Sequence, residues 1–460
     1  MFTRREGGGF RPKLFNVVIA LGLVLCATTL VLSYIVLEAV VARPYSPINP
    51  LLSTQIVLGK KAPQPEPPRK QALRDPAIHK QVPDPPVQKQ TIHTHSYTRV
   101  VHDGTIHIPV VVVTCKRAEY LDRSLEALVK YMPENGTLGR IQFSIIVSRD
   151  CFSEDVEKVI SGPKYAGKIS NMRFRPPEGK VPGHEAVARH YGWIFSQIFD
   201  VLHYPAVLVV EEDMEVSPDF YEYFAAGFDL LNSNPDIMCV SAWNDNGLNG
   251  LAEDIHALYI TDIFPGLGWM MLRGLWEEEL RGQWPTGYWD EFMRMPSVRK
   301  GRVCVRPEVS RAFNYGERGG VNKGQFYKTH LAHILRNTEP IKWTTMDKKV
   351  NPFYNDSLDK QNFDAFLYDA IKVDSDTTRV DDPKDLVSMK NEKEGVLVDV
   401  VTQYTKDNYA SVAKMFGLMT DIKEGIPRCS YKDVIIFKWH GFRVFLALDK
   451  VYDNPDILLQ

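Results

Sequence analysis

The chain has 460 residues and a formal net charge of −2, with 55 Lys and Arg against 57 Asp and Glu. This length allows a large hydrophobic core and more than one folding unit. The balanced charge provides no basic face, which argues against a nucleic-acid partner, although a few local groups could still bind an anionic ligand.

The N-terminus has the pattern of a membrane anchor. Four basic residues precede an apolar run at 14–41, in which Glu38 is the single charge. About 20 apolar residues span a bilayer, and this run is longer than the roughly 7 to 15 residues of a signal-peptide core. We therefore expect an uncleaved anchor, with residues 1–13 in the cytoplasm by the positive-inside rule and the rest of the chain extracytoplasmic or lumenal.

Two sequence features agree with a lumenal compartment. Sequons begin at Asn135 and Asn355, although such triplets also arise by chance. Five cysteines follow the anchor and show no CxxC spacing, so disulfides are expected, and their odd number leaves one thiol unpaired. These cysteines are Cys115, Cys151, Cys239, Cys304 and Cys429.

The segment 42–105 is rich in proline and poor in large apolar residues. Positions 44 to 86 hold 11 of the chain's 30 prolines, with Lys, Gln and Asp between them. Such a composition buries too little apolar surface to fold, so we expect an extended stem.

From Ile106 on, apolar strand patterns alternate with helical patterns. Helical spacing covers 121–132 and 184–200. The runs typical of buried strands are 108–115, 143–148, 206–213 and 236–247. This alternation predicts an α/β domain over 106–345, with a mostly parallel sheet covered on both faces.

A smaller α+β domain is expected over 346–460. A strand pattern at 396–404 is followed by a helical stretch. The run at 433–448 is typical of a β-hairpin that turns at His440-Gly441.

Three carboxylates, Glu211, Glu212 and Asp213, follow directly on an apolar strand run. Ligands of such sheets bind beyond the carboxyl ends of the strands, where Arg117 and Asp150 should also lie. Adjacent carboxylates at that position repel one another and lose solvation unless a cation binds. Hard oxygen ligands suit Mg²⁺ or Mn²⁺, which commonly bridge a carboxylate to phosphates.

The alternative explanation of the acidic run is a solvated helix start. Ser217, Pro218 and Asp219 form a plausible capped N-terminus, where acids are favourable. This explanation covers Ser217 and Asp219, but it does not cover the carboxylates at the end of the strand.

A second acidic pair lies in the aromatic segment 284–294. Asp290 and Glu291 stand between Trp289 and Phe292. An aromatic ring can pack against a sugar, and a carboxylate beside it could take a proton from an attacking hydroxyl. From the residues alone, an ordinary helix with two exposed acids explains the segment better.

The segment 314–326 combines four glycines with Arg318 and Lys323. This composition is typical of a loop that closes over an anionic ligand, and equally of a plain surface loop. It lacks the P-loop spacing. The His184-Glu185 pair lacks the second histidine of a HExxH zinc motif, so a zinc protease is set aside.

Together these segments resemble the N-acetylglucosaminyltransferase I family of the Golgi. The resemblance runs from about Ile108 to the C-terminus, and the tail, anchor and stem match the family only in plan. The stretches that carry it are CVSAWNDNG (239–247), FPGLGW (264–269), RVCVRPEVSR (302–311), the EED run, GQF and YTKDNYASVAKMFGLMTDIKEGIPR (404–428).

The resemblance implies a GT-A type, Rossmann-like nucleotide-sugar-binding domain in a single-pass type II Golgi membrane protein with a lumenal catalytic domain. It implies UDP-N-acetylglucosamine (UDP-GlcNAc) as donor and Mn²⁺ as cofactor. The implied reaction is inverting transfer of N-acetylglucosamine, in β1,2 linkage, to the α1,3-linked mannose of a high-mannose (Man5) N-glycan. This step starts hybrid and complex N-glycan synthesis.

The family's acidic motif falls on Glu211, Glu212 and Asp213. By resemblance, Asp213 is the metal ligand and Glu211 contacts the donor sugar. Glu212 would bind the ribose, and its side chain is longer than the family's usual Asp.

Other family positions also have counterparts. Arg117, Asp150 and His190 match residues that hold the nucleotide. Val321 matches a donor-contacting loop residue, and Asn322 stands where the family usually has Ser.

Asp290 matches the catalytic base of the family, with Trp289 against the donor sugar. Inversion needs one displacement, in which Asp290 removes the proton of the mannose 2-hydroxyl as that oxygen attacks C1. The resemblance also implies two disulfides and a free Cys429; the pairs are Cys115 with Cys151 and Cys239 with Cys304.

Two alternatives are weighed against this function. A sister enzyme adds the same sugar in β1,2 linkage to O-linked mannose, but it carries a folded sugar-binding domain where this chain has a proline-rich stem. A catalytically silent, metal-dependent sugar-binding protein is disfavoured because Asp213 and Asp290 are both retained.

Overall fold

The computed structural model describes residues 104–460, except 177–178, 180, 319–323, 373–376 and 394. The expected tail (1–13), anchor (14–41) and nearly all of the stem (42–105) lie outside the described residues. Within the described part of the chain, no helix is long and apolar enough to cross a membrane.

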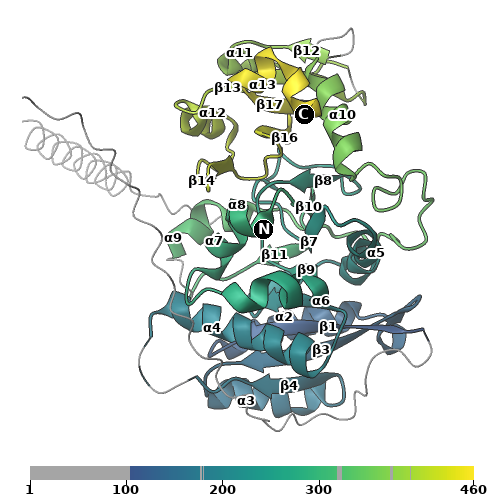
Figure 1. Ribbon diagram of the computed structural model, residues 1–460, viewed down its shortest axis with the longest axis vertical. Helices are drawn as coiled ribbons and strands as arrows, with labels where there is room; N and C mark the ends of the chain where they lie inside the picture. Colours follow the sequence, from purple (N-terminus) through teal and green to yellow (C-terminus); the bar gives the residue numbers. More distant parts are fainter. Residues whose placement is uncertain (1–103, 177–178, 180, 319–323, 373–376, 394) are drawn as a thin grey trace, which may run out of the picture. The chain divides into compact units, whose positions relative to one another are not determined.

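A nine-stranded sheet organises the first part of the described chain (Figure 1). Its strands are β1 Ile106–Thr114, β2 Thr137–Leu138, β3 Ile141–Arg149, β4 Ile169–Arg173, β5 Ala206–Glu211, β7 Ile237–Ser241, β8 Leu258–Thr261, β9 Trp269–Leu272 and β10 Val303–Pro307. The order is β2-β3-β1-β5-β9-β7-β10-β8, with β4 beside β3. A separate two-stranded sheet pairs β6 (Met214–Val216) with β11 (Ala312–Asn314).

The large sheet is mixed, whereas the sequence predicts a mostly parallel one. β1, β3, β4 and β5 are mutually parallel, as are β7 and β10. β9 is antiparallel to both β5 and β7, and β8 is antiparallel to β10. β8 and β9 have four residues each, which is too short for a periodic pattern to show in the sequence.

Helices cover both faces of the sheet, as predicted. Alternate residues of a strand point to opposite faces, so Val110 and Val112 pack in one core and Val111 in another. α2, α3 and α5 contribute to the first core, and α4 contributes to the second. The helices are α2 Ala118–Tyr131, α3 Glu154–Ser161, α4 Gly183–Phe195, α5 Phe220–Ser233, α6 Arg273–Leu275, α7 Trp289–Arg294, α8 Pro296–Arg299, α9 Gly324–Thr329, α10 Lys360–Ile371, α11 Pro383–Ser388, α12 Tyr409–Phe416 and α13 Asp449–Asp453.

The C-terminal part contains a four-stranded sheet in the order β12-β13-β17-β16 (Figure 1). Its strands are β12 Thr377–Arg379, β13 Val398–Tyr404, β16 Val434–Trp439 and β17 Phe442–Leu448. β16 and β17 form the predicted hairpin, which turns at His440 and Gly441, both with positive φ (49° and 85°). That geometry fits the two-residue turn that matches strand twist.

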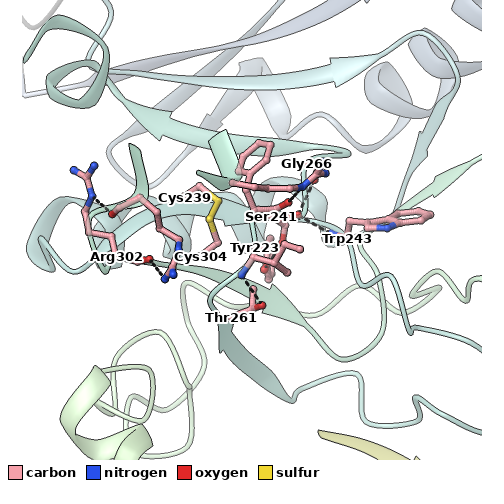
Figure 2. Close-up of a disulfide and its surroundings, with 12 residues drawn as sticks. Tyr223, Cys239, Ser241, Trp243, Thr261, Gly266, Arg302 and Cys304 are labelled. Carbon is pink, nitrogen blue, oxygen red and sulfur yellow. Dashed lines mark hydrogen bonds between the residues drawn. A yellow bond between two sulfur atoms is a disulfide. The ribbon is translucent and has the colours of Figure 1, made fainter. Parts of the chain in front are cut away.

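Both disulfides implied by the resemblance are present. Cys115 is bonded to Cys151. Cys239 and Cys304 face each other in the β7–β10 register and are bonded, as Figure 2 shows. Cys429 is free and buried.

The helix start behind the acidic run differs from the predicted cap. α5 begins after Asp219, whose side chain makes no capping hydrogen bond. The Asp219 carboxylate is instead buried, and it accepts from Ser217 Oγ at 2.6 Å and Arg311 Nε at 2.9 Å. Asn337 and Trp343 donate to it as well. A solvated cap is therefore the wrong interpretation, because Asp219 is the centre of a buried and fully hydrogen-bonded polar network.

Candidate active site

The ends of three parallel strands bring the predicted residues together. In the strand register Thr114 lies opposite Arg149, and Val113 lies opposite Glu211. The segments that follow β1, β3 and β5 therefore leave the sheet at the same edge. This confirms the expectation that Arg117, Asp150 and the acidic run would share one edge.

Arg117 contacts two of the three acids. Its Nε lies 2.6 Å from Glu212 Oε1, and its Nη2 lies 2.9 Å from Asp213 Oδ2. Both carboxylates are buried, with exposed fractions of 5% and 6% for the two residues. These charges raise the pKa of Arg117, although burial acts in the opposite direction. In this structure the guanidinium supplies the positive charge that the buried carboxylates require.

The Glu212 carboxylate is bound on both oxygens. Oε1 accepts from Arg117, while Oε2 accepts from the Thr114 hydroxyl and, at 3.2 Å, from the Cys115 amide. Glu212 thus ties the end of β1 to the end of β5.

Asp213 is held by the last residue of β11 and by the residues that follow it. Asn314 Nδ2 donates to Asp213 Oδ1 at 3.2 Å, and the Tyr315 amide donates to the Asp213 carbonyl at 2.9 Å. A Cβ atom at Gly316 would overlap Asp213 Oδ2. The glycine at this position therefore lets the backbone approach the carboxylate closely.

Glu211 lies at the end of β5 and contacts Tyr191. Its Oε1 accepts from Tyr191 Oη at 3.0 Å. Burial and the negative charge of Asp213 raise the pKa of Glu211 to about 7. A cation beside these two carboxylates would relieve this repulsion.

Asp150 and His190 lie near the end of β3, at the same edge of the large sheet. His190 is buried, and its Nε2 lies 2.8 Å from Ser148 Oγ. Burial lowers the pKa of His190 to about 3, so the ring is neutral at physiological pH. Burial raises the pKa of Asp150 to about 6. Within the described residues, Asp150 Oδ1 is buried and has no hydrogen-bond partner.

Asp290 lies in the first turn of the short helix α7, next to Trp289. The indole of Trp289 is buried and stacks on Tyr191, with 4.2 Å between ring centroids. Asp290 is more open, with a side chain 43% exposed, and Oδ2 accepts from Arg294 Nη1 at 2.7 Å. The predicted helix is thus observed, but its two acids are half-buried instead of exposed, and both form ion pairs with the buried Arg294.

Tyr191 links these two acidic regions. Its hydroxyl binds Glu211, its ring stacks on Trp289, and the charge of Asp290 is among the causes that raise its own pKa. Sequence reasoning missed Tyr191, because a tyrosine on the inner face of a predicted helix is indistinguishable from an ordinary core residue. Arg294 was missed because the sequence of a short helix does not show which of its charged residues is buried, whereas Asn314 and Gly316 belong to the glycine-rich segment already identified.

Two predicted residues cannot be placed. Val321 and Asn322 lie outside the described residues. The described part of the same segment, from Asn314 to Arg318, does reach the site, since the Arg318 carbonyl accepts from Arg117 Nη1 at 3.2 Å.

The acidic edge fits a hard divalent cation. Asp213 and Glu211 supply carboxylate oxygens, and Asn314 lies beside Asp213. Oxygen donors of this kind suit Mg²⁺ or Mn²⁺. Cys115, Cys151 and Asp150 are also close together, but both sulfur atoms are in a disulfide and cannot act as thiolate ligands.

The sequence matches one known protein family over most of its length. A model of the GNT-I family matches residues 70–457. The chain belongs to the GNT-I family. This result confirms the family resemblance seen in the sequence.

An enzyme of Arabidopsis thaliana is similar to this chain over most of its length. The alpha-1,3-mannosyl-glycoprotein 2-beta-N-acetylglucosaminyltransferase of Arabidopsis thaliana is 31% identical over 378 residues, which cover 81% of this chain and 79% of the relative.

Solved structures match this GNT-I family member with low TM-scores and low sequence identity. A mannosyltransferase from Pyrobaculum calidifontis, in complex with GDP-Man and Mn²⁺, has a TM-score of 0.30 at 16% identity, over 48% of this chain and 58% of that chain. S. aureus TarS 1-349 in complex with UDP has a TM-score of 0.33 at 14% identity, over 59% and 76% of the two chains. These scores are too low to support an argument about the site.

Proposed function

We propose that this protein is a metal-dependent inverting glycosyltransferase. It moves N-acetylglucosamine from UDP-GlcNAc to the α1,3-linked mannose of a Man5 N-glycan in β1,2 linkage, and so starts hybrid and complex N-glycan synthesis. Family membership and the activity named for the Arabidopsis relative support this reaction. The observation that carries it is the position of Tyr191, which joins the acidic edge at Glu211 to the Trp289-Asp290 pair.

The nucleotide would bind at the Asp150 end of the edge. The unpartnered Asp150 Oδ1 is a buried acceptor, and an ionised carboxylate there can accept the N–H of a uracil ring. The ring of His190 is held by Ser148 and is neutral, so it would line the nucleotide site without adding a charge. Arg117 has the donors and the charge to hold the diphosphate.

The diphosphate would lie over the acidic edge with a divalent cation, for which we propose Mn²⁺. Asp213 would be the ligand, oriented by Asn314 and by the close approach of Gly316. When bound, the cation offsets negative charge on the departing diphosphate. Arg117, which balances Asp213 in this structure, would contribute its positive charge to holding the diphosphate beside this site.

The donor sugar would lie between Glu211 and Trp289, and the acceptor would approach from the exposed side of Asp290. Asp290 then takes the proton of the mannose 2-hydroxyl while that oxygen attacks C1 from the face opposite the diphosphate. One displacement inverts the α-linked donor and gives a β-linked product.

We also propose the setting of this reaction. The fold is of the GT-A type, and the protein is a single-pass type II protein of the Golgi membrane with its catalytic part in the lumen. The apolar run at 14–41, the basic residues before it and the two disulfides support this topology.

One assay tests the function against its alternatives. The chain is incubated with UDP-GlcNAc, Mn²⁺ and either a Man5 N-glycan or an O-mannosyl peptide, and UDP release and product mass are measured. We expect metal-dependent transfer to the N-glycan, with a β1,2 linkage by NMR. Transfer only to the O-mannosyl peptide would indicate the sister activity, and binding without transfer would indicate a silent sugar-binding protein.

A further inference from the structure

We propose that Arg294 is a positioning residue for Asp290. We further propose that Lys423, from the C-terminal part, pairs with Glu291 and so keeps Arg294 bound to Asp290. The proposal rests on the proposed function, in which Asp290 is the base. It concerns four charged side chains that form a chain of contacts: Asp290, Arg294, Glu291 and Lys423.

Arg294 is fixed in place. The residue is 5% exposed, and its Nε donates to the Phe264 carbonyl at 3.2 Å. A buried guanidinium must be paired, because removing it from water without a partner carries a large energetic penalty. Since Phe264 also packs edge-on against Trp289, Arg294 is held by the same loop that holds the indole.

This fixed cation orients the base. Arg294 Nη1 binds Asp290 Oδ2 at 2.7 Å, whereas the side chain as a whole stays 43% exposed. One carboxylate oxygen is therefore tied to the protein, which leaves Oδ1 to receive the proton. Because rates depend steeply on the alignment of reacting groups, a displacement of about 1 Å can lower the rate by roughly 10²-fold.

Glu291 competes for the same guanidinium. Its Oε1 lies 3.4 Å from Arg294 Nη1, so it is a second, more distant ion-pair partner beside Asp290. Lys423 Nζ lies 2.6 Å from that same Oε1. The lysine pairs with Glu291 and leaves the shorter Arg294 contact to Asp290. The four side chains together carry two positive and two negative charges.

The lysine is itself held on the first part of the structure. It lies in β14 (Ile422–Lys423), which pairs with β15 (Ile426–Pro427). Just beyond, Arg428 binds Asp421 at 3.0 Å and Asp245 at 3.4 Å. The C-terminal part thus reaches Glu291, the neighbour of the proposed base, through Lys423, which is 132 positions away from Glu291 in the sequence.

The test uses substitutions in the full chain, with kcat and both KM values measured in the N-glycan assay. Arg294→Met should lower kcat by roughly 10²-fold, with KM for UDP-GlcNAc within about 2-fold, and Arg294→Lys should recover part of the loss. A purely structural role would lower the amount of folded enzyme and would not separate the two variants in kcat per folded molecule. Arg294→Met with wild-type kcat would overturn the proposal.

Lys423 provides a second test if Arg294→Met fails to fold. Lys423→Met should lower kcat about 3- to 10-fold, because Glu291 is then free to draw Arg294 away; coupled neighbours show such non-additive effects. Adding Glu291→Gln should restore kcat toward the wild-type value. A double variant no more active than Lys423→Met alone contradicts the proposal.

The control is Arg443→Met. Arg443 makes a comparable ion pair with Asp399 in the C-terminal sheet, at 2.5 and 2.8 Å. The Arg443→Met variant should be less stable than the wild type but have the same kcat. If the wild-type chain itself shows no transfer, the proposed function fails; if it transfers and the Arg294 and Lys423 variants behave as the wild type, only the positioning role fails.

Discussion

The two acidic regions of the site are built in opposite ways. At the end of β5, Glu212 and Asp213 are buried and fixed by Arg117 and neighbouring donors. On α7, Asp290 is partly exposed and has one short contact, to Arg294. A metal site needs carboxylates held together against their repulsion, whereas a base must remain open to a second substrate. The predictions below are ordered by expected effect and test this division.

The largest effect is expected at the open carboxylate. Asp290→Asn keeps the shape of the side chain but removes its basicity, so kcat should fall by about 10³-fold, within the range typical of a lost general base. Because Asp290 is proposed to act on the acceptor hydroxyl and not to hold the nucleotide, calorimetry should give a UDP affinity within a few-fold of the wild type. An active Asn variant would exclude Asp290 as the base.

At the buried cluster, substitution should affect ligand binding first. Asp213→Ala removes the proposed metal ligand, so UDP binding in the presence of Mn²⁺ should weaken by roughly 10²-fold, a loss of about 3 kcal/mol. Metal-free UDP binding should change much less. These affinities can be measured by calorimetry with and without EDTA.

Glu215→Ala is the matched control for the metal site. Glu215 lies two residues further along, in β6, and pairs with Arg123 and Arg336 instead of reaching the strand edge. Its replacement should leave the metal dependence unchanged. Equal metal dependence in Asp213→Ala and the wild type would contradict the ligand assignment.

A smaller effect is expected when the support of Asp213, the proposed metal ligand, is changed. Gly316→Ala would push a Cβ into Asp213 Oδ2, and Asp213 is already tied to Arg117 and Asn314. Apparent Mn²⁺ affinity should fall by about 10-fold, as is typical for groups that orient a ligand. Titration of activity against Mn²⁺ measures the shift.

Gly282→Ala serves as the comparison, because a Cβ there meets nothing within 4 Å. It should retain the wild-type Mn²⁺ titration. The same loss in both variants would show that the effect of Gly316→Ala is not specific to Asp213.

The contrast also explains what the sequence could predict. The sequence predicted that the residues after β1, β3 and β5 share one edge of the sheet. Each of these strands is a clear apolar run, and parallel strands bring their carboxyl ends to the same edge. The hairpin at His440 and Gly441 was predictable from its turn residues.

Other features depend on contacts between distant segments. Tyr191, Arg294 and Lys423 gain their roles only when α4, α7 and β14 meet. Burial of Asp219 follows from Arg311, 92 positions away, so its local sequence resembles a simple helix cap. The residues around Asp290 alone favoured an exposed surface helix, and only the family resemblance singled it out.

The smallest predicted effect concerns pH at the nucleotide end. Burial raises the pKa of Asp150 to about 6, while His190, with a pKa of about 3, stays neutral above pH 5. Asp150 is therefore mostly ionised at pH 7 and mostly protonated at pH 5. If the ionised oxygen accepts the uracil N–H, UDP-GlcNAc affinity should fall by up to about 10-fold between pH 7 and pH 5, because each pH unit below the pKa removes about 1.4 kcal/mol.

UDP-GlcNAc is the suitable probe, since its diphosphate is esterified at both ends and does not titrate in this window. Glu211, with a pKa of about 7, titrates in the same window. Asp150→Asn should therefore bind more weakly at pH 7 and show a shallower profile by calorimetry, whereas a slope as steep as that of the wild type would assign the titration to Glu211 or another group.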